Sequence, residues 1–207
     1  MKKYILCCCL ILVFKILPAQ TWTWDSLVIS DGPISLVKDH LDHVYTFTQH
    51  RNVLAKYNST GNLLWQKIFP AYSVEIMNVI CGGDNVIYLT GTFYESITID
   101  SQTITSAGSA DIFVAKLDES GVVIWLRQIS SKGNEESGDL CLDKANKLLI
   151  TGSTSDTTNF SGTVVPKAAN RDLFITRYDL AGNFETAFFA SFISSSDPLA
   201  MAQKELK

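Results

Sequence analysis

The sequence predicts an all-β fold, arranged as an incomplete β-propeller of about three four-stranded antiparallel blades. The first observation is a pattern in residues 112–130, where two apolar runs flank an Asp-x-x-Gly turn and the second run contains a Trp. Residues 53–69 and 173–189 share most of this pattern at spacings of 60 and 61 residues. A fixed period of this kind is typical of repeat architectures. The aligned positions are Lys56, Lys116 and Arg177, with the glycines Gly61, Gly121 and Gly182.

The other two observations are short strand-like segments separated by tight turns and the lack of helical periodicity before the C-terminal tail. The composition fits a folded chain, because 46% of the 207 residues are hydrophobic and 18% are charged. Residues 1–19 hold three of the 17 basic residues and no acidic one, so the remainder carries 14 basic and 21 acidic residues, a net charge of −7. This acidic balance disfavours nucleic acid as a partner.

Residues 1–19 have the features of a secretory signal peptide. Lys2 and Lys3 precede an apolar stretch at 4–14, and Ala19 offers a small residue before a cleavage point at Gln20. The alternative, a membrane anchor, is disfavoured because the stretch is shorter than the ~20 residues that a span needs. We therefore expect a secreted or cell-surface protein whose mature chain has no membrane span.

The mature chain divides into a clasp-like strand at 20–33, three units at 34–70, 71–130 and 131–193, and a tail at 194–207. In the first unit, strands are expected at 34–39, 44–48, 53–57 and 63–69. In the second unit they are expected at 74–81, 86–93, 112–117 and 122–129, and in the third at 139–142, 147–154, 173–178 and 184–192. A small edge hairpin is expected at 97–105, with a counterpart of the third unit near 159–168.

Two tryptophans recur at the end of the fourth strand, Trp65 and Trp125, with Thr186 in their place in the third unit. We expect them to pack between neighbouring blades, because aromatic side chains dominate cores. The alternative is a stacking platform for a ligand.

The units resemble the SBBP-type β-propeller repeats of secreted bacterial proteins. The pattern is carried by residues 87–91, by 111–118 and by Gly121 with Trp125; in the third unit it is carried by 149–152, 172–177 and Gly182. The resemblance covers residues 34–192 and implies a large exported protein of gliding-type bacteria. It implies no particular activity. The turn with Trp also looks like the repeat of quinone-dehydrogenase propellers, whose cofactor-site residues have no counterpart here.

The sequence offers few candidates for chemistry. It has no Gly-x-Ser-x-Gly, no phosphate-binding loop, no Gly-x-Gly-x-x-Gly and no Cys-x-x-Cys. His40 and His43 could share a metal in one turn, but zinc needs three or four converging ligands, and His50 falls too far along the strand to join them. No metal and no cofactor is expected.

Aspartates recur in the turns. Asp118 and Asp179 could bind calcium, but the 6–8 oxygens that calcium takes make turn capping the better explanation. Asp84 and Asp143 follow the first strand of their units, where a propeller could present a ligand face; the alternative is again a turn role. They are the candidate ligand-face or turn residues.

Two functions remain open. We favour a non-enzymatic binding or structural role, with a protein or a glycan as partner, because no paired acid and base recurs toward one face. The alternative is a secreted hydrolase or lyase with its site in the propeller channel. Closed propellers have 4–8 blades, so three units predict exposed apolar faces and self-association. Cys81 and Cys141, one unit apart, are expected to remain free thiols.

Overall fold

The computed structural model describes residues 34–48, 52–70, 73–166 and 172–191, and these residues form an all-β structure. The signal peptide and clasp-like strand (1–33), His50 and the tail (194–207) lie outside the described residues. Within the described ranges, no helix has the length and apolarity that a membrane span requires. One 3-10 turn, η1 (Gly83–Asn85), accompanies the strands.

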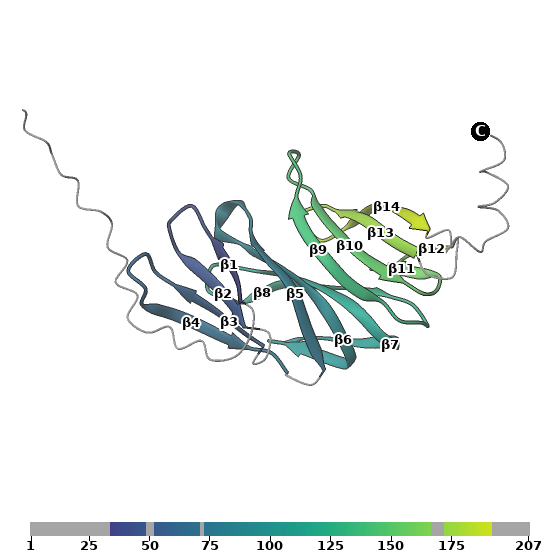
Figure 1. Cartoon of the computed structure of the whole chain (residues 1–207), viewed down its shortest axis with the longest axis horizontal. Coiled ribbons are helices and arrows are strands. Elements are labelled where there is room, and N and C mark those ends of the chain that lie inside the picture. The colour runs from purple at the N-terminus through teal and green to yellow at the C-terminus, as the bar shows by residue number, and fades with distance from the viewer. Residues whose placement is uncertain (1–33, 49–51, 71–72, 167–171, 192–207) are drawn as a thin grey trace, which may run out of the picture.

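The strands form three antiparallel sheets that follow one another along the chain (Figure 1). The first sheet contains β1 (Ile34–Lys38), β2 (Val44–Thr48), β3 (Val53–Tyr57) and β4 (Leu63–Ile68). The second contains β5 (Val74–Cys81), β6 (Ile87–Ile99), β7 (Gln102–Leu117) and β8 (Val123–Ser130), extended by β11 (Thr158–Phe160) and β12 (Thr163–Val165). The third contains β9 (Glu136–Leu142), β10 (Leu148–Thr154), β13 (Asp172–Tyr178) and β14 (Phe184–Ser191).

Most strands lie within a few residues of their predicted bounds, and β2, β3 and β5 match them. The hairpin predicted at 97–105 is present, but it continues β6 and β7 rather than forming a separate edge element. Ile99 pairs with Gln102 at its tip, and a bulge between Tyr94 and Ser96 lets the strands bend while they remain paired.

The second predicted hairpin is present at Thr158–Val165, but its placement at the edge of the third unit is wrong. β11 pairs with β8, so the hairpin extends the second sheet. The edge of β8 would otherwise present unpaired backbone groups. The ring of Phe160, which is fully buried, lies 5.3 Å from that of Phe174 and 5.2 Å from that of Phe184. The hairpin therefore belongs to one sheet by its hydrogen bonds and packs against the next.

One five-residue turn recurs between neighbouring strands of all three sheets. An Asp or Asn at its first position accepts hydrogen bonds from the backbone N–H groups two and four residues later. The fourth position has a positive φ, which Gly, Asn and Asp tolerate. The turns begin at Asp39, Asn58, Asp118, Asp143 and Asp179.

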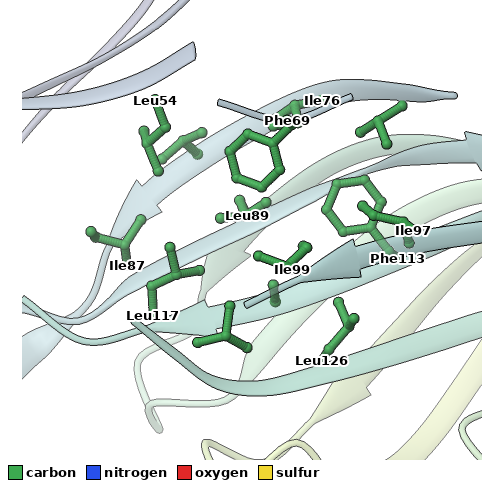
Figure 2. Packing of buried hydrophobic residues seen from close by; sticks show 14 of the residues in the cluster. Leu54, Phe69, Ile76, Ile87, Leu89, Ile97, Ile99, Phe113, Leu117 and Leu126 are labelled. Atoms are coloured by element: carbon green, nitrogen blue, oxygen red, sulfur yellow. The ribbon is translucent and has the colours of Figure 1, made fainter. Parts of the chain in front are cut away.

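Apolar side chains fill the spaces between adjacent sheets. Figure 2 shows Leu54 and Phe69, from the first part of the chain, above Leu89, Ile99 and other side chains of the second sheet. A second cluster joins the second and third sheets. The first strands also approach one another, since β1 contacts β5 and β5 contacts β9. The three sheets therefore stack by their faces, with their first strands along one side.

Candidate functional site

Three side chains lie opposite one another across the first sheet: Tyr45 on β2, Lys56 on β3 and Trp65 on β4. The Lys56 ammonium lies 5.2 Å from the centre of the Tyr45 ring and donates to the backbone carbonyl of Glu119 at 3.1 Å. Trp65 Nε1 donates to the same carbonyl at 2.9 Å. Glu119 belongs to the turn between β7 and β8, so this Tyr-Lys-Trp ladder ties the first sheet to the second.

The second sheet has the same ladder, formed by Tyr88, Lys116 and Trp125. Lys116 Nζ and Trp125 Nε1 donate to the carbonyl of Leu180 at 3.0 and 3.2 Å. Leu180 lies in the turn between β13 and β14 of the third sheet. The predicted packing of both tryptophans between units is confirmed, and their indole N–H groups are engaged by the protein itself.

Each tryptophan packs on the glycine of the turn that it contacts. Gly121 and Gly182 both have φ +81, and a Cβ added to them would lie 3.1 Å from the Trp65 ring and 3.0 Å from the Trp125 ring. Both positions therefore require glycine for two reasons: only glycine readily adopts this backbone conformation, and only glycine lets the indole ring approach so closely.

The third sheet has no such ladder. Leu149, Arg177 and Thr186 occupy the corresponding cross-strand positions. Arg177 Nε instead lies 2.8 Å from a carboxylate oxygen of Glu185, which also pairs with Lys147. In the third sheet, Thr186 therefore stands where the other sheets have the Trp, and Arg177, which stands where they have the Lys, pairs with Glu185.

An exposed apolar surface, here called the open face, covers one side of the third sheet. It consists of two cross-strand rows, Thr151–Ile175–Phe188 and Ser153–Leu173–Ala190. Leu173, Ile175 and Phe188 are 42%, 50% and 68% exposed. A hollow of about 500 Å³ lies over these rows, and Glu136 and Gly138 of β9 complete its lining.

The same positions of the second sheet are covered. Ile112 and Val114, each 61 residues before Leu173 and Ile175, are 0% and 1% exposed and belong to the apolar cluster that joins the second and third sheets. The open face is therefore the counterpart of a surface that is buried between sheets elsewhere in this chain.

A pair of buried carboxyl groups lies where the second and third sheets meet. Asp111 on β7 and Glu135, just before β9, are both 0% exposed. Asp111 Oδ2 accepts from the backbone N–H of Ala107 at 2.7 Å and from Gln128 Nε2 at 2.6 Å. Glu135 Oε1 accepts from Ser131 Oγ at 2.5 Å.

Thr154 Oγ1 also donates to Glu135 Oε1, at 3.0 Å. No donor of the described residues reaches the two remaining oxygens, Asp111 Oδ1 and Glu135 Oε2. The two carboxyl groups are within hydrogen-bond reach of one another, and such a bond needs a proton. Burial, together with the neighbouring Asp111 carboxyl, raises the pKa of Glu135 to about 7.

The predicted candidate residues lie in turns. Asp143 Oδ1 accepts from the backbone N–H groups of Ala145 and Lys147, both at 2.8 Å, so it stabilises the turn between β9 and β10. Asp84 lies in η1 between β5 and β6. Among the described side chains, no group of three or more His, Cys, Asp or Glu is placed to hold a metal ion.

His40 and His43, which were considered as metal ligands, lie in the turn that Asp39 caps. His43 Nδ1 lies 2.9 Å from Asp39 Oδ2, and Asp39 caps the turn that contains His40. Several hydrogen bonds to that carboxylate, from His43 and from the backbone of Leu41, outweigh burial and lower the pKa of Asp39. Cys81 and Cys141 carry free thiols in the structure.

Sequence reasoning predicted exposed apolar faces but named none of the residues of the open face, and it missed the carboxyl pair. The sequence contained an indication of the Tyr-Lys-Trp ladder, because Lys56, Lys116 and Arg177 occupy the same position in the three units. Asp111 was visible as part of the motif at 111–118. Nothing local marks Glu135 as its partner, since the two are 24 residues apart in sequence.

Comparisons with known proteins find matches among solved structures only. No protein-family model matches the chain, and no curated protein matches it. Twelve chains of solved structures match. One of them, a protein of unknown function from Bacteroides caccae, has a TM-score of 0.43 and 8% identity over 78% of this chain. The match spans 62% of that protein's length.

Proposed function

We propose that this chain is an exported or cell-surface β-propeller repeat protein with a non-enzymatic binding or structural role. The proposal extends the resemblance of residues 34–192 to SBBP-type repeats and the signal-peptide pattern of residues 1–19. Three antiparallel sheets, stacked by their faces with their first strands along one side, support a propeller-like arrangement. The sheets are then blades, and the chain is a partial ring.

The observation that carries the binding role is the open face. Monomeric soluble proteins expose few contiguous apolar patches, and such patches commonly mark sites of interaction. Here Leu173 and Ile175 are exposed at positions whose counterparts in the second sheet, Ile112 and Val114, are buried, and Phe188 is exposed beside them. The open face is therefore the contact surface that we assign to this protein.

The buried carboxyl pair does not favour the alternative of a hydrolase or lyase. A general acid or base must come within hydrogen-bond reach of its substrate. Asp111 and Glu135 are both 0% exposed, and they accept hydrogen bonds from the side chains of Gln128 and Ser131. The pair is a structural element of the junction between two sheets.

Retention on candidate partners tests the proposal. The exported protein should be retained by an immobilised cell-surface protein or glycan fraction, and Ile175→Lys should abolish that retention. Ile124→Lys is the matched control, since Ile124 is also an isoleucine that is 50% exposed. Turnover of a glycan or peptide substrate that persists in the Ile175→Lys variant would support the enzyme instead. N-terminal sequencing of the exported protein should begin near Gln20.

A further inference from the structure

We propose that the occupant of the open face is a second copy of this chain, seated face to face with the first about a two-fold axis. The axis lies in the interface and runs across the strands, so that the strands of the two copies point in opposite directions. This inference rests on the proposed role of the open face as a contact surface, and it names the partner.

The first reason is continuity with interfaces that the chain already contains. The first and second sheets bury this same side against the next sheet, with Leu54, Ile112 and Val114 at 0 to 1% exposure. The third sheet places Leu173 and Ile175 at positions equivalent to Ile112 and Val114, but they meet no sheet in the described residues. A sheet-like apolar surface is therefore the kind of surface that fits them.

The second reason excludes simple head-to-tail stacking, in which the next surface would be another first sheet. Within the chain, that mode depends on a Lys and a Trp that hold the carbonyl of the following turn. In the third sheet, Arg177 is paired with Glu185 and Thr186 replaces the Trp. The third sheet therefore lacks the Lys and Trp donors that bind the carbonyl of the following turn in the other two sheets.

The third reason is that the open face complements itself. Phe188 projects from β14 at 68% exposure, beside a hollow of about 500 Å³ whose lining includes the small side chains of Ser153 and Ala190. A two-fold interface brings the same patch of both copies together, so it requires a ridge and a recess on one surface. The Phe188 ring of each copy can enter the recess of the other.

The fourth reason is charge. Glu136 lies opposite Ser153 at one end of the rows, whereas Arg177 lies beyond Ile175 at the other end. The Arg177 side chain is 45% exposed and pairs with Glu185, which also pairs with Lys147. Opposed strand directions bring the Glu136 end of one copy to the Arg177 end of its partner. Opposite charges then meet at both ends of the interface.

Light scattering coupled to size exclusion, with the exported protein, tests the inference. Wild type should show twice the mass of one chain at micromolar concentration. Ile175→Lys should show the mass of one chain, with an unchanged circular dichroism spectrum and cooperative melting. Ile124→Lys should remain a dimer. A wild type that stays monomeric, or an Ile175→Lys variant that stays dimeric, would overturn the inference.

Charge reversal tests the orientation. Glu136→Arg and Arg177→Glu should each weaken the dimer about tenfold or more, and the double variant should recover most of that loss. Open-ended oligomers, or two single losses that simply add in the double variant, would refute the two-fold arrangement. If the protein is monomeric but Ile175→Lys still abolishes retention on a cell-surface fraction, the contact role of the open face stands and the second copy is wrong.

Discussion

Replacing Glu135 by Gln should make the stability of this protein less dependent on pH. In the folded protein, Glu135 faces the Asp111 carboxyl in a fully buried site, which raises its pKa from the ordinary value of 4.5 to about 7. The donors to the two carboxyl groups are neutral: the side chains of Ser131, Thr154 and Gln128, and one backbone N–H. The site is therefore built to hold a proton at moderately acidic pH.

The sign of the effect follows from the two pKa values of Glu135. Below pH 4.5 the group is protonated in both the folded and the unfolded chain, and its ionisation contributes nothing. Between pH 4.5 and about 7 the folded chain binds more protons than the unfolded chain, so the free energy of unfolding falls as pH rises. At about 1.4 kcal/mol per pKa unit, the fall from pH 5 to pH 8 is about 2–3 kcal/mol.

Urea unfolding monitored by tryptophan fluorescence at pH 5 and pH 8 measures this difference. Gln resembles protonated Glu in size and keeps a donor for Asp111, so the Glu135→Gln variant should lose this part of the pH dependence. Glu75→Gln, which removes an exposed carboxylate of β5, is the control and should retain the wild-type pH dependence. Parallel pH profiles for wild type and Glu135→Gln between pH 5 and pH 8 would refute the reasoning.

Three further predictions concern the junctions between sheets. Gly182→Ala should lower the free energy of unfolding by about 1 kcal/mol more than Gly162→Ala; both glycines have positive φ, but a Cβ at Gly182 would meet the Trp125 ring whereas one at Gly162 would meet no atom within 4 Å. Equal losses in chemical denaturation would contradict this contact. Trp125→Phe should cost about 1–2 kcal/mol, since it removes a donor to the third sheet and reduces packing; an unchanged urea midpoint would argue against the ladder. Without reductant, Cys141, which is exposed, should react with a thiol reagent in the folded protein. Cys81, whose pKa burial raises to about 12, should react only after unfolding; a chain with no free thiol would contain the disulfide that we do not expect.

Strand positions could be predicted closely because their causes are local. Short runs rich in apolar residues between turn residues mark β2, β3 and β5, and a side chain at the first position of each five-residue turn caps the backbone four residues ahead. Asp118 and Asp179 were expected to be capping residues for this reason, and they are. Asp143 plays the same part in its turn, which is the simpler of its two predicted roles.

The contacts between Trp65 and the following unit were predictable because the same residue types recur at one period. Whether the stacked sheets form part of a ring, by contrast, cannot be inferred from that period and is still a proposal. Exposed apolar faces were predicted, but the residues of the open face could not be named, because Leu173 and Ile175 have the same sequence pattern as the buried Ile112 and Val114. Their exposure depends on whether another sheet lies over them.

The sequence by itself therefore determined the all-β class, the strands and the capped turns, because hydrogen bonds and side-chain alternation within a few residues suffice to specify them. Tertiary structure alone decided which sheet receives the hairpin at Thr158–Val165, which carboxyl Asp111 faces, and which apolar surface remains uncovered. The physical reason is that these features depend on which edges and faces come together. Segments with the same local pattern acquire different burial, different partners and different protonation once the sheets are stacked.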